Sequence, residues 1–150
     1  MTSQHLFAYG TLVTGILDPQ LAAVLRRYSR MGPWASVAGR LFDLGEYPGA
    51  LPSDTPNQRI RGRLIELLAP ARCLPLLDRY EDVDPDDPAR GLYRREQVEA
   101  RTDGGASIRC WIYWLNHLPH GARPLPDGDW IGLRLPSDKD GVAPPLRRAP

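Results

Sequence analysis

The sequence predicts an α+β domain in which a small, mixed and largely antiparallel β-sheet curls towards a barrel and is flanked by helices. Three observations lead to this fold class. Five or six segments have strand character, most connections between them are too short for parallel crossovers, and only two segments have helical periodicity. The chain has 150 residues, which suits one domain, and 42% hydrophobic with 25% charged residues is typical of globular proteins.

The expected elements follow one another closely along the chain. In order they are a strand at 5–9, a helix from Asp18 to Gly32-Pro33, strands at 35–44 and 60–67, a short helix ending at Tyr80, and strands at 93–101 and 107–115. Asp18 before Pro19 is typical of an N-cap followed by proline at the first helical position, and Gly32-Pro33 predicts the helix end. Pro75 predicts that the second helix begins late, near Leu74, because proline breaks a helix interior.

The last two strands carry the clearest local signal. Residues 102–106, Thr-Asp-Gly-Gly-Ala, separate the segments 93–101 and 107–115, and Asp-Gly supplies the positive φ angles of a tight turn, so an antiparallel hairpin is expected. All five strands should form one sheet around a pocket. Residues 1–135 then make up the domain, and the Pro-rich residues 136–150 are expected to be a flexible C-terminal tail.

The composition argues against several classes of protein. Nineteen basic and eighteen acidic residues give a net charge of +1, so no overall field would recruit nucleic acid or an anionic membrane. No stretch approaches about 18 apolar residues, and the opening residues lack the pattern of a signal peptide. Cys73 and Cys110 are too few for a disulfide framework and are expected to be buried thiols. We therefore expect a cytoplasmic protein without a nucleic-acid or membrane partner.

Several familiar chemistries lack their motif. The sequence has no Walker-type phosphate loop, no GxGxxG turn after a strand, and no GxSxG nucleophile elbow. Lys139 is the only lysine, so no Schiff-base lysine precedes the tail. His117 and His120 are the only close histidine pair, and the proline between them opposes a shared zinc site. We expect neither a metal nor another cofactor.

Two loop-edge segments can carry chemistry. Residues 9–12, Tyr-Gly-Thr-Leu, end the first strand at a glycine, and successive backbone N–H groups in such a turn can bind a carboxylate or an oxyanion. A plain tight turn is the alternative. Glu81 ends the second helix, where the helix dipole disfavours negative charge, and partial burial in a pocket would disfavour that charge as well. The pKa of Glu81 should therefore rise towards the range of a general base. A solvated glutamate at a helix end is the alternative there.

Six motifs in order resemble those of the gamma-glutamylcyclotransferase-like (AIG2-like) family. They are FAYGTL at 7–12, GRLFDLGEYPG at 39–49, GRLIEL at 62–67, LDRYE at 77–81, YRR at 93–95, and WIY at 111–113 followed by GDW at 128–130. The resemblance spans residues 6–131, nearly the whole chain. The family usually has Gly where this chain has Asp82, and the acidic loop 82–88 that begins there leaves the substrate preference open.

The resemblance implies a barrel-like sheet with flanking helices and a reaction that needs no cofactor. In that reaction the α-amine of a γ-glutamyl group attacks its own γ-carbonyl and releases 5-oxoproline with an amine or amino acid. The leaving group stays open, since glutathione, a γ-glutamyl amino acid, a γ-glutamyl-lysine isopeptide and a γ-glutamylated biosynthetic intermediate share the reacting group. The oligomeric state stays open as well.

The resemblance also implies roles for particular residues. Glu81 would be the catalytic acid/base. The substrate-binding candidates are Tyr9, Gly10, Thr11, Leu12, Tyr47, Tyr113 and Arg94. Among them, the backbone amides at 10–12 would hold a carboxylate or oxyanion, and the Tyr113 hydroxyl is expected inside the pocket. Arg94 would either bind a carboxylate or pair with the acidic loop.

Two other classes of protein remain open from the sequence. A binding module would hold a γ-glutamyl metabolite in the same pocket without turnover, and a scaffold protein would use the acidic loop and the Arg-rich tail to contact partners. The enzyme interpretation makes a geometric prediction that separates it from both. The Glu81 carboxylate should face the amides of residues 10–12 across one cavity, within roughly 4–8 Å, so that one ligand group fits between them.

Overall fold

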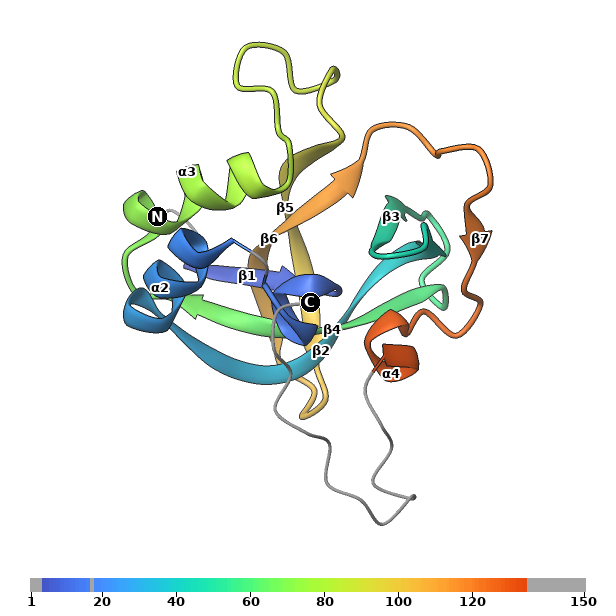
Figure 1. Cartoon of the computed structure of the whole chain (residues 1–150). Coiled ribbons are helices and arrows are strands. Elements are labelled where there is room, and N and C mark those ends of the chain that lie inside the picture. The colour runs from blue at the N-terminus through green and yellow to red at the C-terminus, as the bar shows by residue number, and fades with distance from the viewer. Residues whose placement is uncertain (1–3, 17, 135–150) are drawn as a thin grey trace.

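The computed structural model describes residues 4–16 and 18–134, which form seven strands and four helices (Figure 1). In chain order the elements are β1 (His5–Ala8), α1 (Thr11–Thr14), α2 (Pro19–Tyr28), β2 (Ser29–Asp43), β3 (Pro48–Pro52), β4 (Arg59–Leu67), α3 (Pro70–Tyr80), β5 (Tyr93–Thr102), β6 (Ser107–Leu115), β7 (Arg123–Pro124) and α4 (Trp130–Arg134). The predicted α+β class is confirmed. None of the helices in these residues has the length and apolar character needed to cross a membrane.

Five of the strands close into a barrel. β2, β4, β1, β6 and β5 are hydrogen-bonded in that order, and β5 pairs again with β2 at Ala35–Thr102 and Ser36–Arg101. The β1–β6 pair is parallel, whereas the other strand pairs described are antiparallel, including the β5–β6 hairpin. β3 and β7 pair with the C-terminal part of β2 outside the barrel. The predicted single, largely antiparallel sheet is confirmed.

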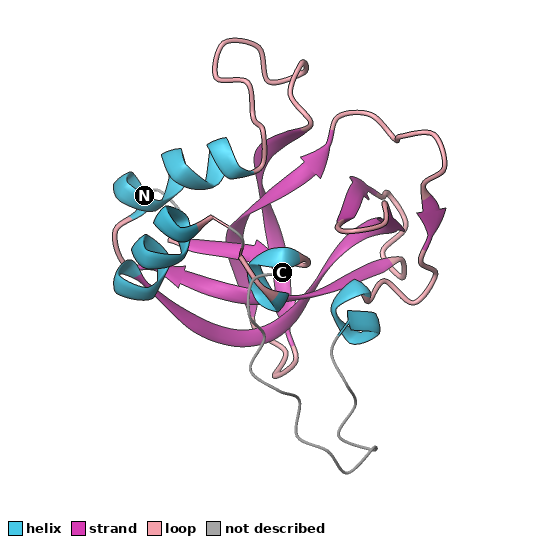
Figure 2. Ribbon diagram, in the orientation of Figure 1, coloured by secondary structure: helices cyan, strands magenta, loops and turns pink. Residues whose placement is uncertain are grey.

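Alternation along the strands builds two apolar cores. In β1, Phe7 belongs to the cluster inside the barrel, whereas Leu6 and Ala8 belong to the cluster that α2 and α3 cover. The two helices lie side by side against this outer face (Figure 2). Cys73 lies in the outer core and Cys110 in the inner core; both are buried free thiols, as predicted.

The start of α2 matches its sequence signal, and its end does not. Asp18 Oδ1 accepts hydrogen bonds from the backbone N–H groups of Gln20 and Leu21, as an N-cap should. The prediction that Gly32-Pro33 ends the helix is wrong, because α2 ends at Tyr28 and β2 begins at Ser29. A shift in register of β2 against β4 between residues 31 and 34 accommodates the proline inside a strand.

The late start predicted for α3 is also wrong. The helix runs from Pro70 to Tyr80 with Pro75 inside it. Proline at position 75 removes the hydrogen bond to the carbonyl of Ala71. Both residues lie on the exposed side of the helix, where water can solvate that carbonyl. Pro70 at the first helical position favours an early start.

Four short elements have no clear sequence signal. These are α1, β3, β7 and α4, each of two to five residues and too short to carry a periodicity. Trp130, in α4, is 2% exposed and packs in the barrel core, so its role is packing. The expected C-terminal tail at 136–150 lies outside the described residues.

Candidate active site

A cavity of about 260 Å³ lies where the turn between β1 and α1 meets the end of α3. Segments distant in sequence form its walls: the end of β1 with the turn after it, the loop before β3, the end of α3, the start of β5, and β6. The lining residues are Phe7, Ala8, Tyr9, Gly10, Thr11, Leu12, Glu46, Tyr47, Pro48, Tyr80, Glu81, Leu92, Tyr93 and Tyr113. The 9–12 turn and Glu81 therefore face the same cavity.

The turn after β1 is built by close packing. A Cβ atom added at Gly10 would lie 2.7 Å from Pro48 Cγ, so only glycine allows this approach between the turn and the start of β3. The hydroxyl groups of Thr11 and Tyr80 share a hydrogen bond of 2.8 Å, which ties the turn to α3. α1 begins at Thr11, and the first N–H groups of a helix have no intrahelical acceptor. The amides of Thr11 and Leu12 are therefore suited to a ligand oxygen.

Glu81 caps the C-terminal end of α3, where its backbone N–H donates to the carbonyl of Leu77. The residue is half-buried, and its side chain reaches the cavity. Removal from water raises the pKa of Glu81 to about 8. Within the described part of the chain, burial is the influence that shifts this pKa. The predicted upward shift is confirmed, and burial is its cause.

Three buried tyrosines surround Glu81, and their hydroxyl groups donate elsewhere. Tyr9 donates to the backbone oxygen of Tyr113, and Tyr93 donates to that of Pro48 at 2.6 Å. Burial raises the pKa of Tyr9, Tyr93 and Tyr113, and the negative charge of Glu81 adds to each shift. The three phenols thus remain neutral and give the cavity a rigid, mostly apolar wall.

Asp78 connects the end of α3 to the β5–β6 hairpin. Arg95 donates to its two carboxylate oxygens at 2.7 and 3.1 Å, and the Tyr113 hydroxyl donates to Oδ1 at 2.7 Å. The guanidinium of Arg95 also lies 4.3 Å from the centre of the Trp111 ring. Asp78 and Glu81 are three residues apart at the end of α3, so these contacts fix the helix end that carries Glu81.

The structure brings together every predicted site residue except Arg94. Tyr9, the residues at 10–12, Tyr47 and Tyr113 line the cavity with Glu81. Tyr113 contributes its ring, while its hydroxyl is bound to Asp78 instead of being free inside the pocket as expected. Tyr47 lies towards the solvent side, with 37% of its surface exposed.

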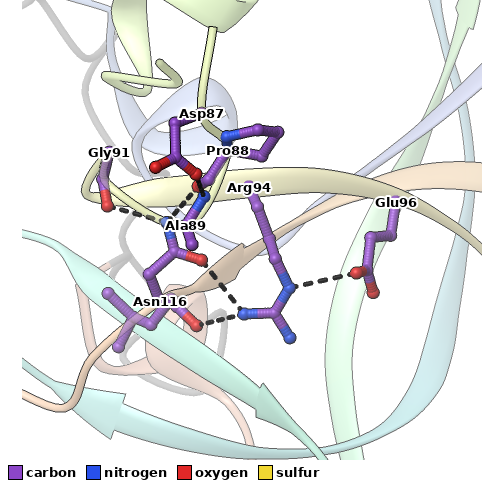
Figure 3. A network of polar contacts seen from close by, with 8 residues as sticks. Asp87, Pro88, Ala89, Gly91, Arg94, Glu96 and Asn116 are labelled. Carbon is purple, nitrogen blue, oxygen red and sulfur yellow. Dashed lines mark hydrogen bonds and ion pairs between the residues drawn. The ribbon is translucent and has the colours of Figure 1, made fainter. Parts of the chain in front are cut away.

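Arg94 belongs to a separate polar network (Figure 3). Its Nε donates to Glu96 at 3.0 Å, and its Nη1 donates to Asn116 Oδ1 at 3.2 Å. Asn116 in turn donates to the carbonyl oxygens of Pro88 and Gly91, which fastens the acidic loop. Arg94 thus supports this loop through Asn116, and it does not line the cavity.

Asp82 has a conformational role next to Glu81. Its φ of 55° is positive, a region that glycine adopts at no cost and other residues rarely enter. A conformational requirement therefore accounts for the glycine expected at this position. The exposed Asp82 does not line the cavity, so its charge is absent from the cavity walls.

Sequence reasoning missed several lining residues. Tyr80 and Tyr93 lie inside two of the family-like motifs, which could have indicated them. Glu46 and Pro48 flank the predicted Tyr47 inside the motif at 39–49, which could have indicated them as well. No group of three or more His, Cys, Asp or Glu side chains suited to hold a metal ion occurs among residues 4–16 and 18–134.

Comparison with protein families resolves the membership of the chain. The family described as gamma-glutamyl cyclotransferase, AIG2-like, matches residues 6–132. The chain belongs to this family. The match runs from within β1 to within α4 and thus covers all residues that line the cavity. A search of curated proteins gave no match.

Solved structures share the gamma-glutamyl cyclotransferase fold. YkqA from Bacillus subtilis is 24% identical with a TM-score of 0.60, over 86% of this chain, which spans only 40% of YkqA. YtfP from Escherichia coli is 23% identical with a TM-score of 0.58, over 87% of this chain and 98% of YtfP. An AIG2-like protein from Mus musculus is 20% identical with a TM-score of 0.56, over 79% of this chain and 82% of the mouse protein. These likenesses concern the fold.

Proposed function

We propose that the cavity cyclises a γ-glutamyl compound without a cofactor, releasing 5-oxoproline and an amine or amino acid. The observation that carries the proposal is the position of Glu81, whose pKa is raised to about 8, in the same cavity as the 9–12 turn. A proton acceptor with a pKa near the working pH is what this reaction needs, because the substrate amine is an ammonium at neutral pH. Membership of the gamma-glutamyl cyclotransferase family supports this class of reaction.

The reaction begins with proton transfer and ring closure. The Glu81 carboxylate takes one proton from the substrate α-ammonium, and the resulting amine attacks the γ-carbonyl carbon. A carbon–nitrogen bond forms, and the carbonyl oxygen becomes an oxyanion. The attack is intramolecular, so a pocket that holds the substrate folded gains an effective molarity of up to about 10⁵–10⁸ M.

Collapse of the tetrahedral intermediate, with the new ring intact, completes the exchange. The Glu81 carboxylic acid gives its proton to the leaving nitrogen, whose bond to the γ-carbon breaks as the carbonyl re-forms. The ring nitrogen still carries one extra proton, which passes to the Glu81 carboxylate. From there it leaves with solvent or with the departing amine. One carboxyl group serves both nitrogens because both are bonded to the same tetrahedral carbon.

The 9–12 turn supplies the other part of the site. The backbone N–H groups of Thr11 and Leu12 would hold the substrate carboxylate or the developing oxyanion, the roles that fit donors at the start of a helix. Tyr9, Tyr93 and Tyr113 are locked by their own hydrogen bonds and would position the aliphatic part of the glutamyl group. Arg94 is left out of this assignment.

Product analysis by mass spectrometry tests the proposal. The purified chain is incubated with glutathione, a γ-glutamyl amino acid, the γ-glutamyl-lysine isopeptide and γ-glutamyl amines, with enzyme-free controls for spontaneous cyclisation. We expect 5-oxoproline and an equal amount of free amine from at least one substrate. Release of glutamate would indicate hydrolysis instead, and saturable binding without any product would indicate a binding module; either result overturns the proposal.

A further inference from the structure

The charges that line the cavity are unbalanced. Its fourteen lining residues include two carboxylic acids, Glu46 and Glu81, and no lysine, arginine or histidine. The one cationic candidate from the sequence, Arg94, is bound to Glu96 and Asn116 outside the cavity. A second negative group on the substrate would therefore meet two acids and no cation.

Glu46 lies at the solvent side of this cavity. It lines the wall but is exposed, whereas Glu81 is more deeply placed. A leaving amine bonded to the γ-carbon beside Glu81 has to extend towards solvent to depart. The two acids therefore have different positions along the substrate: Glu81 at the reacting carbon, and Glu46 near the far end of the leaving group.

The loop that carries Glu46 is braced. The backbone N–H of Leu44 donates to the carbonyl of Tyr47 at 3.0 Å, and that of Gly45, at a φ of 109°, donates to Asp43 Oδ1 at 2.9 Å. The Arg134 guanidinium bridges Asp43 and the Gly45 carbonyl oxygen. The turn is thus held at both sides, so the backbone of Glu46 has a fixed place beside the cavity.

The cations near this loop are directed at Asp43 and not at Glu46. Arg123 and Arg134 both form ion pairs with the nearly buried Asp43 carboxylate, at 3.6 and 3.3 Å. Within residues 4–16 and 18–134, Glu46 has no ion-pair partner. Its charge therefore remains available to a ligand in the cavity.

We propose that Glu46 makes this site select γ-glutamyl conjugates whose leaving amine carries a second, cationic nitrogen, as a diamine does. The inference rests on the proposed cyclisation at Glu81. A cationic end approaches Glu46 favourably, whereas the carboxylate of a peptide leaving group is repelled by the same charge. The acidic residue that sets substrate preference is thus Glu46 rather than Asp82.

A matched substrate series tests this selection. The γ-glutamyl conjugates of 1,4-diaminobutane, pentylamine and 4-aminobutanoate have similar lengths and end in a cationic, a neutral and an anionic group. We expect kcat/KM for 5-oxoproline release to favour the cationic over the neutral conjugate by about fivefold or more, and to be lowest for the anionic one. The cationic preference should shrink with added salt, because Glu46 is exposed.

Three variants assign the preference to one residue. Glu46→Gln should bring the ratio of cationic to neutral substrate close to one, and Glu46→Lys should reverse the order of the cationic and anionic conjugates. Glu99→Gln, an exposed acid on β5 outside the cavity, serves as the matched control and should retain the wild-type ratio. Equal ratios in wild type and Glu46→Gln would overturn the inference.

The series also separates this inference from the proposed function. If another γ-glutamyl substrate is cyclised but none of these conjugates is, the cyclisation stands and the selection is overturned. If no γ-glutamyl substrate at all yields 5-oxoproline, the proposed cyclisation fails, and the same three compounds are compared by calorimetric binding. A Glu46-dependent affinity for the cationic conjugate would then preserve the selection without the chemistry. Equal affinities, or no binding of any conjugate, would overturn it.

Discussion

At the scale of single residues, the burial of Glu81 carries a thermodynamic cost that can be measured. Its folded-state pKa of about 8 lies above the ordinary value of 4.5, so the folded protein binds an extra proton between these two pH values. The stability that depends on this proton is complete below about pH 4.5, falls as the pH rises, and is lost above about pH 8.

Glu81→Gln removes this dependence, because glutamine has no proton to lose. We predict that the free energy of unfolding of the variant rises relative to that of wild type as the pH goes from about 5 to about 9. At about 1.4 kcal/mol per pKa unit, the relative gain should reach roughly 2–4 kcal/mol at pH 9. Urea unfolding at both pH values measures the difference. A constant difference between the two proteins across this range would contradict the raised pKa.

Asp82 offers a second test at a single residue. Its positive φ is tolerated by aspartate but penalises a β-branched side chain. Asp82→Val should lower the free energy of unfolding by about 1–2 kcal/mol, whereas Asp82→Gly should stay within about 1 kcal/mol of wild type. Thermal unfolding of the two variants provides the comparison, and equal losses in both would show that charge, not conformation, matters at this position.

At the scale of elements, α3 links the catalytic candidate to the sheet. Asp78→Ala leaves Arg95 and the Tyr113 hydroxyl without their acceptor, so the helix end that carries Glu81 loses its anchor. We predict a loss of about tenfold or more in kcat with a smaller change in KM, because misplacement of an acid/base affects the transition state most. Asp78→Asn, which keeps an acceptor for Tyr113, should recover part of kcat. A KM effect alone would contradict this positioning role.

Helix and strand limits depended on contacts that the sequence does not display. Asp18 and Pro19 indicated the start of α2 correctly, because an N-cap is a local interaction. The helix limits predicted from Pro75 and Gly32-Pro33 were wrong, because the effect of each proline depends on its surroundings in the fold. Solvent compensates for the missing hydrogen bond of Pro75, and an irregularity in strand pairing accommodates Gly32-Pro33 inside β2.

At the scale of the whole molecule, the barrel determines which residues can meet. The motifs predicted that the 9–12 turn and Glu81 belong to one site, and the fold places both on one cavity. The motifs did not show which of Arg94 and Glu46 lines the cavity. Arg94 follows the cavity-lining Tyr93 but is bound outside the cavity, whereas Glu46 reaches the cavity because β3 pairs with β2.

The rate of 5-oxoproline release by wild type and Glu81→Gln, measured on the best γ-glutamyl substrate, tests the central claim most directly. As controls, circular dichroism checks that the variant still folds, and a measurement of substrate affinity checks that it still binds. Since glutamine can hydrogen-bond but cannot accept the ammonium proton, we predict a loss of at least about 10²-fold in kcat. Comparable turnover by the two proteins would contradict the assignment of Glu81 as the acid/base.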